Sequence, residues 1–216
     1  MFIGHFAPAF AAAAASSKAP RLGTLFVAAQ LIDLGFFTLV LAGVEKLRLA
    51  PGNGTLFPVD LYHMPYTHSL LGAAVWGIGF ALLLRMRGAS WHAGLIGGAV
   101  VVSHWFLDWL VHIPDLTLLG SPPKLGLGLW RHPMIEIPLE LALTFGTLGW
   151  WAKASGAWQR ARGRVLMLAG VLLAVQLINW FGPAPTDVRL AMPLMALGTY
   201  ALLIWLAYRV RPTQTP

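Results

Sequence analysis

The stretch from residue 91 to residue 112 reads WHAGLIGGAVVVSHWFLDWLVH and decides the fold. It is long and apolar enough for a bilayer core about 30 Å thick, which needs roughly 20 residues of helix. Its second half nevertheless carries His104, Asp108 and His112, which are spaced four residues apart and therefore share one face of a helix. An apolar helix with one ionisable face predicts a membrane bundle built around a polar centre.

The rest of the chain has the composition of an integral membrane protein. Of its 216 residues, 57% are hydrophobic and only 11% are charged, and the mean hydropathy is +0.69. Soluble domains carry about 25% charged residues, so an ordinary soluble fold is excluded. Cysteine is absent, which excludes disulfides, thiolate metal sites and cysteine nucleophiles. We predict an all-α fold, a polytopic membrane helical bundle that forms one domain over residues 1–216.

The apolar stretches predict about seven segments. Six full spans are expected at about residues 22–44, 67–86, 91–112, 133–152, 164–182 and 188–208. The short Ala-rich stretch 4–16 lacks the basic residues that open a signal peptide, so we expect a short first helix, with cleavage as the alternative. Polar groups concentrate before residue 140, and residues 164–208 are expected to supply two supporting spans.

The basic residues divide unequally between the two ends of these segments. One end receives ten of them: Lys18, Arg21, Arg85, Arg87, Lys153, Arg160, Arg162, Arg164, Arg209 and Arg211. The other receives Lys46, Arg48, Lys124, Arg131 and Arg189. Because the more basic loops stay in the cytoplasm, we predict an external N-terminus and a cytoplasmic C-terminus. The net charge of +7 is thereby explained without nucleic acid as a partner.

The ionisable residues of the spans all fall on the side opposite the basic loops. His92 is the one histidine outside this group. The group consists of His5, Asp33, His63, His68, His104, Asp108, His112, His132, Glu136 and Glu140. We therefore predict a site near the outer face of the membrane.

Imidazole and carboxylate groups repeated at four-residue steps are what a divalent metal ion requires. The number of such groups exceeds the needs of one tetrahedral ion, so two or three ions are expected, with bridging carboxylates between them. We expect His63, Thr67 and Glu140 to orient the ligands through hydrogen bonds. The structural alternatives are that Asp33 pairs with a neighbouring polar group, that His63 is interfacial, and that residues 104–112 form a metal-free network.

The chain resembles the bacterial membrane-bound metal-dependent hydrolases, the inner-membrane-associated hydrolase family. The resemblance is carried by Asp33, by the run from His63 to Ser69 (HMPYTHS), and by His104 with Asp108. It implies a multi-pass protein of the bacterial inner membrane that hydrolyses its substrate with bound metal.

The order of the polar residues is also similar to that of zinc-dependent phospholipase C and the related single-strand nucleases. This second resemblance implies a Zn²⁺ site with catalytic roles for Asp33 and Asp108, the latter bridging two ions. The metal ligands that it implies are His5, Asp33, His68, His104, Asp108, His112, His132 and Glu136.

These observations predict an integral-membrane zinc-dependent hydrolase, phospholipase-like, that cleaves a phosphoester of a lipid or lipid-linked substrate. Membrane lipid would then be both solvent and substrate, and the sequence does not identify protein partners. A zinc lipid amidase similar to the ceramidases is the alternative enzyme. The same polar residues are also compatible with a metal or proton transporter or a haem-binding electron carrier, and the basic loops with a scaffold that binds a regulator.

Overall fold

The computed structural model describes residues 1–210 except 51, 53, 56–57 and 184–185. A short 3₁₀ helix, η1 (Ile3–Phe6), runs into α1 (Ala7–Ala15). The remaining helices are α2 (Leu22–Leu41), α3 (Leu70–Met86), α4 (Trp91–Val111), α5 (Pro133–Ala154), α6 (Ala157–Phe181) and α7 (Ala191–Arg209). The predicted all-α class is confirmed, and the described helices overlap the predicted segments, although α6 begins seven residues before the predicted start at residue 164.

Four of the described helices, α2, α4, α6 and α7, are long and apolar enough to cross a membrane. The chain therefore has the character of a membrane protein, but six full spans are not confirmed. Helix α3 has 17 residues and is short for a span. Helix α5 has 22 residues and carries Glu136 and Glu140. Both side chains are buried, so the polar residues of this helix face the interior of the protein.

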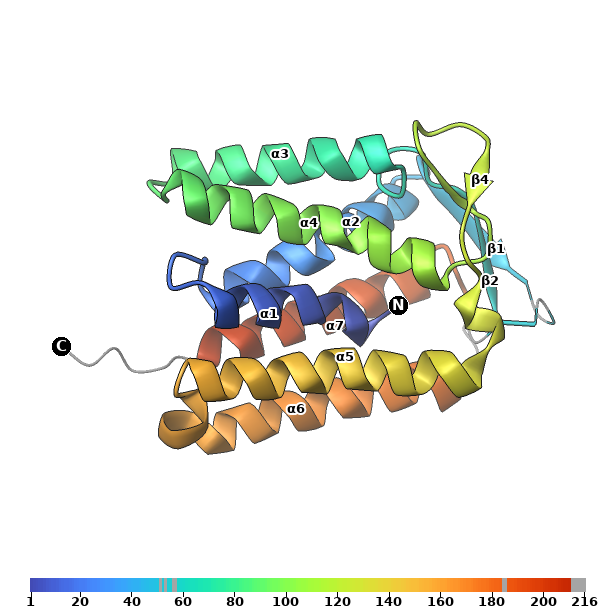
Figure 1. Ribbon diagram of the computed structural model, residues 1–216. Helices are drawn as coiled ribbons and strands as arrows, with labels where there is room; N and C mark the ends of the chain where they lie inside the picture. The colour runs from blue at the N-terminus through green and yellow to red at the C-terminus, as the bar shows by residue number, and fades with distance from the viewer. Residues whose placement is uncertain (51, 53, 56–57, 184–185, 211–216) are drawn as a thin grey trace.

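The two ends of the bundle differ in structure (Figure 1). At one end, strands β1 (Lys46–Leu49) and β2 (Val59–His63) form an antiparallel hairpin, as do β3 (Leu116–Thr117) and β4 (Lys124–Leu125). A bridge between Ser69 and Thr117 ties the second hairpin to the start of α3. The prediction of an all-α fold did not include these strands. We call this the hairpin end.

The opposite end, the basic end, holds the α3–α4 and α5–α6 turns and the end of α7 (Figure 1). Three arginines there lie over indole rings, with guanidinium-to-centroid distances of 5.7, 5.0 and 5.0 Å. The pairs are Arg85–Trp91, Arg162–Trp158 and Arg209–Trp205. Such amphipathic pairs are typical of a membrane–water interface, where indole rings and basic side chains both gather.

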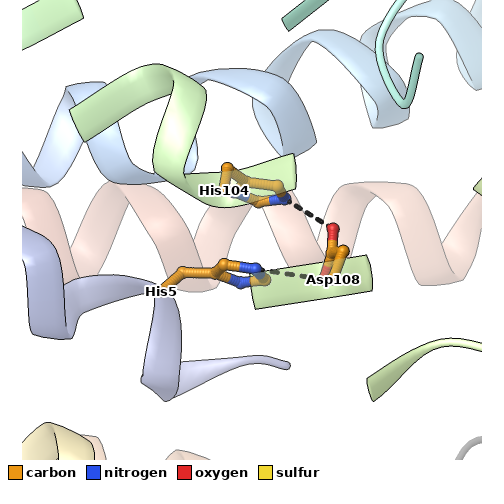
Figure 2. A group of neighbouring side chains, drawn as sticks. All are labelled: His5, His104 and Asp108. Atoms are coloured by element: carbon orange, nitrogen blue, oxygen red, sulfur yellow. Dashed lines mark ion pairs between the residues drawn. The ribbon is translucent and has the colours of Figure 1, made fainter. Parts of the chain in front are cut away.

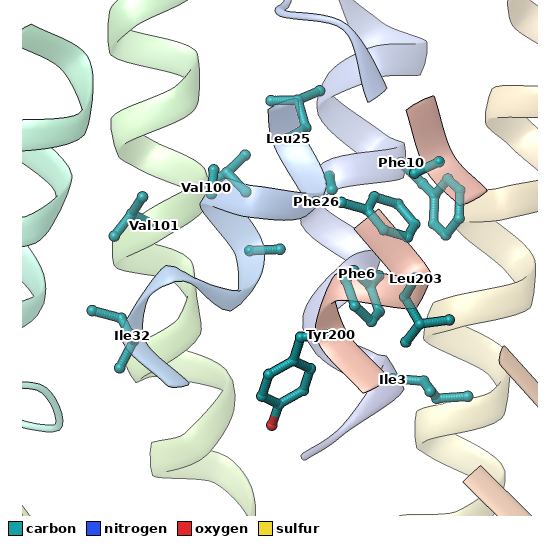
Figure 3. Close-up of a cluster of buried hydrophobic side chains, with 14 of the residues drawn as sticks. Ile3, Phe6, Phe10, Leu25, Phe26, Ile32, Val100, Val101, Tyr200 and Leu203 are labelled. Atoms are coloured by element: carbon teal, nitrogen blue, oxygen red, sulfur yellow. The ribbon is translucent and has the colours of Figure 1, made fainter. Parts of the chain in front are cut away.

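Helix α1 lies inside the bundle and packs against α5, α2 and α4 (Figure 1). The buried side chains of η1 and α1 include Phe6, which stacks on Phe26 at 4.2 Å, and Phe10, which lies 5.7 Å from the Trp151 ring. Figure 3 shows the rings of Phe6, Phe10 and Phe26 beside Leu203 of α7. The predicted short N-terminal helix is therefore a central element of the core.

Helices α3 and α4 approach each other through glycines. A Cβ at Gly77 would lie 2.9 Å from the carbonyl oxygen of Gly98, and one at Gly98 would lie 2.8 Å from that of Gly77. Small residues permit this close backbone contact, which is a main source of helix association in lipid. Close packing against α3 thus fixes the position of α4, whose polar face lies toward α1 and α2.

Candidate metal centre

Asp108 lies at the centre of the polar cluster because α4 presents its ionisable face to the interior. Ser90 caps the N-terminus of α4, because its hydroxyl accepts a hydrogen bond from the backbone amide of Ala93 at 3.2 Å. Seventeen residues of apolar helix then separate the basic end from Asp108, which is 1% exposed. His104 lies one turn before Asp108, and His112 follows directly after the last residue of the helix.

Each carboxylate oxygen of Asp108 faces a different set of nitrogens. Oδ1 lies 3.0 Å from His5 Nε2, 3.3 Å from His112 Nε2 and 3.1 Å from the amino group of Met1. Oδ2 lies 3.1 Å from His104 Nε2 and 3.6 Å from His68 Nε2. Figure 2 shows the rings of His5 and His104 converging on Asp108. One carboxylate therefore joins two groups of imidazoles.

Asp33 of α2 completes the second group. Its Oδ1 lies 3.4 Å from His68 Nε2 and 3.5 Å from His104 Nε2. Its Oδ2 accepts a hydrogen bond from the Tyr200 hydroxyl of α7 at 2.7 Å. The Asp33 side chain is 14% exposed, against 4% or less for the other side chains of the cluster. The cluster is therefore most accessible at Asp33.

Three of the imidazoles are anchored through Nδ1. His104 Nδ1 lies 2.8 Å from the carbonyl oxygen of Ala29, and His112 Nδ1 lies 2.9 Å from Asp115 Oδ1. Both acceptors lack a hydrogen to give, so both Nδ1 atoms must be the donors. In the neutral ring, Nε2 then carries a lone pair, and in both residues Nε2 faces Asp108.

The third anchor is a chain of three residues. The Thr67 hydroxyl donates to Glu45 Oε2 at 2.6 Å and lies 2.8 Å from His68 Nδ1. A hydroxyl has one hydrogen, so Thr67 must accept from His68 Nδ1. Glu45 also accepts the backbone amides of Tyr66 and Thr67 through Oε1. The Nε2 atom of His68 therefore keeps its lone pair, which faces the cluster. In the sequence, His68 directly precedes Ser69, the N-cap residue of α3.

The donor set fits a divalent cation. The Nε2 atoms of the four histidines lie 3.0 to 3.6 Å from carboxylate oxygens of Asp33 and Asp108. In the neutral rings, both atoms of each such pair are acceptors, and a cation between them would satisfy both. The His5 ring, neither of whose nitrogens makes a hydrogen bond within the described residues, stacks on His104 at 3.7 Å and 4°. Protonating all four rings would add four positive charges to that of the Met1 amino group, more than the carboxylates of Asp33, Asp108 and Asp115 offset. With neutral rings, the Met1 amino group and one divalent ion balance these three carboxylates.

Two overlapping groups of described residues have ligand atoms close enough to hold an ion. His5, His104 and Asp108 form one, and Asp33, His68 and His104 form the other, with all ligand atoms of a group within 4.8 Å of one another. These His and Asp side chains, all buried except the partly exposed Asp33, could hold a metal ion. His112 lies against Asp108 in the same cluster.

The structure leaves three of the eight expected ligands, His112, His132 and Glu136, outside these two groups, although His112 lies against Asp108. The side chain of His132, the residue before α5, is exposed at the hairpin end. Glu136 is buried, but its Oε2 has no hydrogen-bond partner within the described residues. His63, expected to orient a ligand, is exposed on β2, and His92 is exposed at the basic end. For His132 and Glu136, metal ligation stays a prediction.

Thr67 and Glu140 do make hydrogen bonds beside the cluster, but Glu140 does not orient a ligand side chain directly. It accepts the backbone amides of Phe2 and Gly4. Four partners were missed from sequence: Glu45, Asp115, Tyr200 and Gln176. Asp115 had a signal, because a carboxylate three residues after a histidine can reach its ring. The remaining three lie far along the chain from the groups they contact.

No family model, curated protein or solved structure matches the chain. The resemblances drawn from the motifs therefore stay predictions.

Proposed function

We propose that this protein is an integral-membrane hydrolase that uses two or three Zn²⁺ ions to cleave a phosphoester of a lipid or lipid-linked substrate at the hairpin end. The observation that carries the proposal is the convergence of four imidazole Nε2 atoms on Asp108, with Asp33 beside two of them. The proposed ligands are His5, Asp33, His68, His104, Asp108 and His112. A divalent ion held there supplies Lewis acidity and a source of hydroxide at neutral pH.

Within this centre, Asp108 fixes the separation of the two imidazole groups, since each of its oxygens faces one of them. The anchors on Nδ1 hold His68, His104 and His112 in the tautomer that ligation requires. Preorganised donors of this kind need no rearrangement when the ion or the substrate arrives.

We expect Asp33 to contact the substrate, because it is the most accessible member of the cluster. Tyr200 holds its Oδ2, which leaves Oδ1 on the side of the imidazoles. In the proposed hydrolysis, water adds its hydroxyl to phosphorus and the ester P–O bond breaks. The Asp33 carboxylate takes the proton of the water and returns it to the departing alkoxide.

A lipid substrate is favoured by the position of the cluster in the bundle. Asp108 and His112 lie at the end of α4 that reaches the hairpin end, and His68 lies next to the α3 cap at the same end. Only 22% of the apolar stretch of α6 and 28% of that of α7 are buried within the protein. The remaining apolar surface suits contact with lipid chains, whose head groups would lie level with the hairpin end.

Metal analysis of the purified full-length protein tests the proposal. Wild type is expected to retain zinc, whereas Asp108→Asn and His104→Ala should lose it. His92→Ala is the matched control, because His92 is an exposed histidine far from the cluster on the same helix. Asp108→Asn keeps the shape of the side chain, so metal loss in a variant that elutes as a folded species reports ligation. Negligible zinc in wild type and variants alike refutes the proposal.

The substrate class is tested separately with a panel of lipids and mass spectrometry. Release of a phosphate monoester or a diglyceride supports phosphoester hydrolysis. Release of a fatty acid from an amide indicates the lipid amidase instead. Zinc uptake into proteoliposomes without lipid turnover indicates a transporter and contradicts the hydrolase.

A further inference from the structure

The segment that carries His5 is held by side chains of two distant helices. We call residues 2–5 the strap. The backbone amides of Phe2 and Gly4 both donate to Glu140 Oε1 of α5, at 2.6 and 2.9 Å. The amide of Ile3 donates to Gln176 Oε1 of α6 at 3.3 Å. Amides in the first turn of a helix have no helical acceptor, and a site in an apolar bundle offers little water to replace one.

Glu140 and Gln176 also bind each other. Gln176 Nε2 donates to Glu140 Oε2 at 2.9 Å, and both side chains are buried, at 0% and 1% exposed for Gln176 and Glu140. Each oxygen of Glu140 and each end of the Gln176 amide therefore has a partner. This arrangement permits only one orientation of the Gln176 amide, because the reverse would set Nε2 against the Ile3 amide.

The strap fits closely against this pair. A Cβ at Gly4 would lie 3.3 Å from Glu140 Oε1, so the backbone approaches the carboxylate at a position without a side chain. The next residue is His5, whose ring stacks on His104 and whose Nε2 lies 3.0 Å from Asp108 Oδ1. A shift of the strap therefore moves a proposed ligand directly.

We propose that Glu140 and Gln176 form a clamp that positions His5 in the metal centre, so that α6 helps to determine metal affinity although it supplies no ligand. The clamp rests on the proposed metal centre. Glu140 and Gln176 are positioning residues that act through the strap. A buried carboxylate is costly in an apolar bundle, but it accepts amide hydrogen bonds more strongly than a neutral group and so resists displacement of the strap.

The hydrogen-bond pattern provides a specific test by exchange of the two residues. In the double variant Glu140→Gln/Gln176→Glu, the new amide at 140 can accept from Phe2 and Gly4 and donate to the new carboxylate at 176. That carboxylate can accept from Ile3, so every bond of the clamp is restored. Each single variant breaks the pattern. Glu140→Gln sets two amide donors against each other, and Gln176→Glu sets two buried carboxylates against each other.

The measurements are zinc affinity, by chelator competition, and the visible spectrum of the cobalt(II)-loaded full-length protein in detergent. The single variants are expected to bind zinc about 10- to 100-fold more weakly, the range for loss of a group that orients a ligand. Their cobalt spectra should change toward that of His5→Ala, a change that a purely structural role would not produce. The exchanged double variant should recover wild-type affinity to within about threefold. Asn179→Leu, an exposed polar-to-apolar change on α6, is the control and should bind as wild type does.

The clamp is refuted if the single variants bind zinc with wild-type affinity and an unchanged cobalt spectrum. It is also refuted if the exchanged variant folds yet binds as weakly as the weaker single variant, because Glu140 would then act by its own charge or as a ligand. Failure of the metal centre itself gives a different result, since wild-type protein would then bind neither zinc nor cobalt.

Discussion

The Thr67 hydroxyl is the only link between Glu45 and the His68 ring within the described residues, so its removal gives a sharp test of ligand orientation. Thr67→Val keeps the shape of the side chain and deletes Oγ1. Glu45 still accepts the amides of Tyr66 and Thr67, which keeps the loop in place. His68 Nδ1 loses its acceptor in a buried position, and the ring becomes free to rotate or to change tautomer.

The expected loss in zinc affinity is about 10- to 100-fold, which corresponds to about 1.4 to 2.7 kcal/mol. This range agrees with the cost of about 1 to 3 kcal/mol for a buried donor left unsatisfied. The assay is chelator competition on full-length protein, with Thr67→Ser as the control, since serine retains the hydroxyl. Wild-type affinity in Thr67→Val, or equal weakening in Thr67→Ser, would show that the chain of hydrogen bonds does not orient the ligand.

Three further predictions concern the centre and its scaffold. Tyr200→Phe should lower zinc affinity by about fivefold, equivalent to one hydrogen bond of about 1 kcal/mol to Asp33, and unchanged affinity in chelator competition would contradict it. Removing metal with a chelator should lower the thermal unfolding temperature. Zinc at 100 times its dissociation constant should then raise the free energy of unfolding by about 2.7 kcal/mol. An unfolding temperature that does not respond to zinc would count against a bound ion. Gly77→Ala should destabilise the fold by roughly 1 to 3 kcal/mol, because its Cβ would meet the Gly98 carbonyl, whereas Gly79→Ala meets no atom within 4 Å and should be tolerated in the same unfolding assay.

The sequence predicted the helical class and the segment positions because a bilayer restricts a chain to long apolar helices. It predicted the association of His104, Asp108 and His112 because their four-residue spacing is local to α4. The two small hairpins were missed. Their strands are short, and the segment that joins the strands of the first is rich in Gly and Pro, which is equally compatible with an irregular loop.

The partners of the cluster were harder to predict because they depend on tertiary packing. Glu45 lies 22 residues before Thr67, and Tyr200 lies 167 residues after Asp33, so no local pattern joins them. Gln176 is flanked by apolar residues of α6, and its spacing gives no indication of a partner. For His132, metal ligation stays a prediction, because spacing alone does not place its side chain in the cluster. Its spacing to Glu136 is correct for a shared helix face, but it precedes α5, and its side chain is exposed.

The central position of α1 has a consequence for how the protein is made. Helix α1 leaves the ribosome before the helices that must enclose it, and it packs against α2, α4 and α5. The part of the chain up to His112 contains every ligand of the proposed centre, yet Glu140 and Gln176, which hold the strap, come later in the sequence. The strap can therefore be held in place only after α5 and α6 have joined the bundle, which makes completion of the proposed centre a late step in folding.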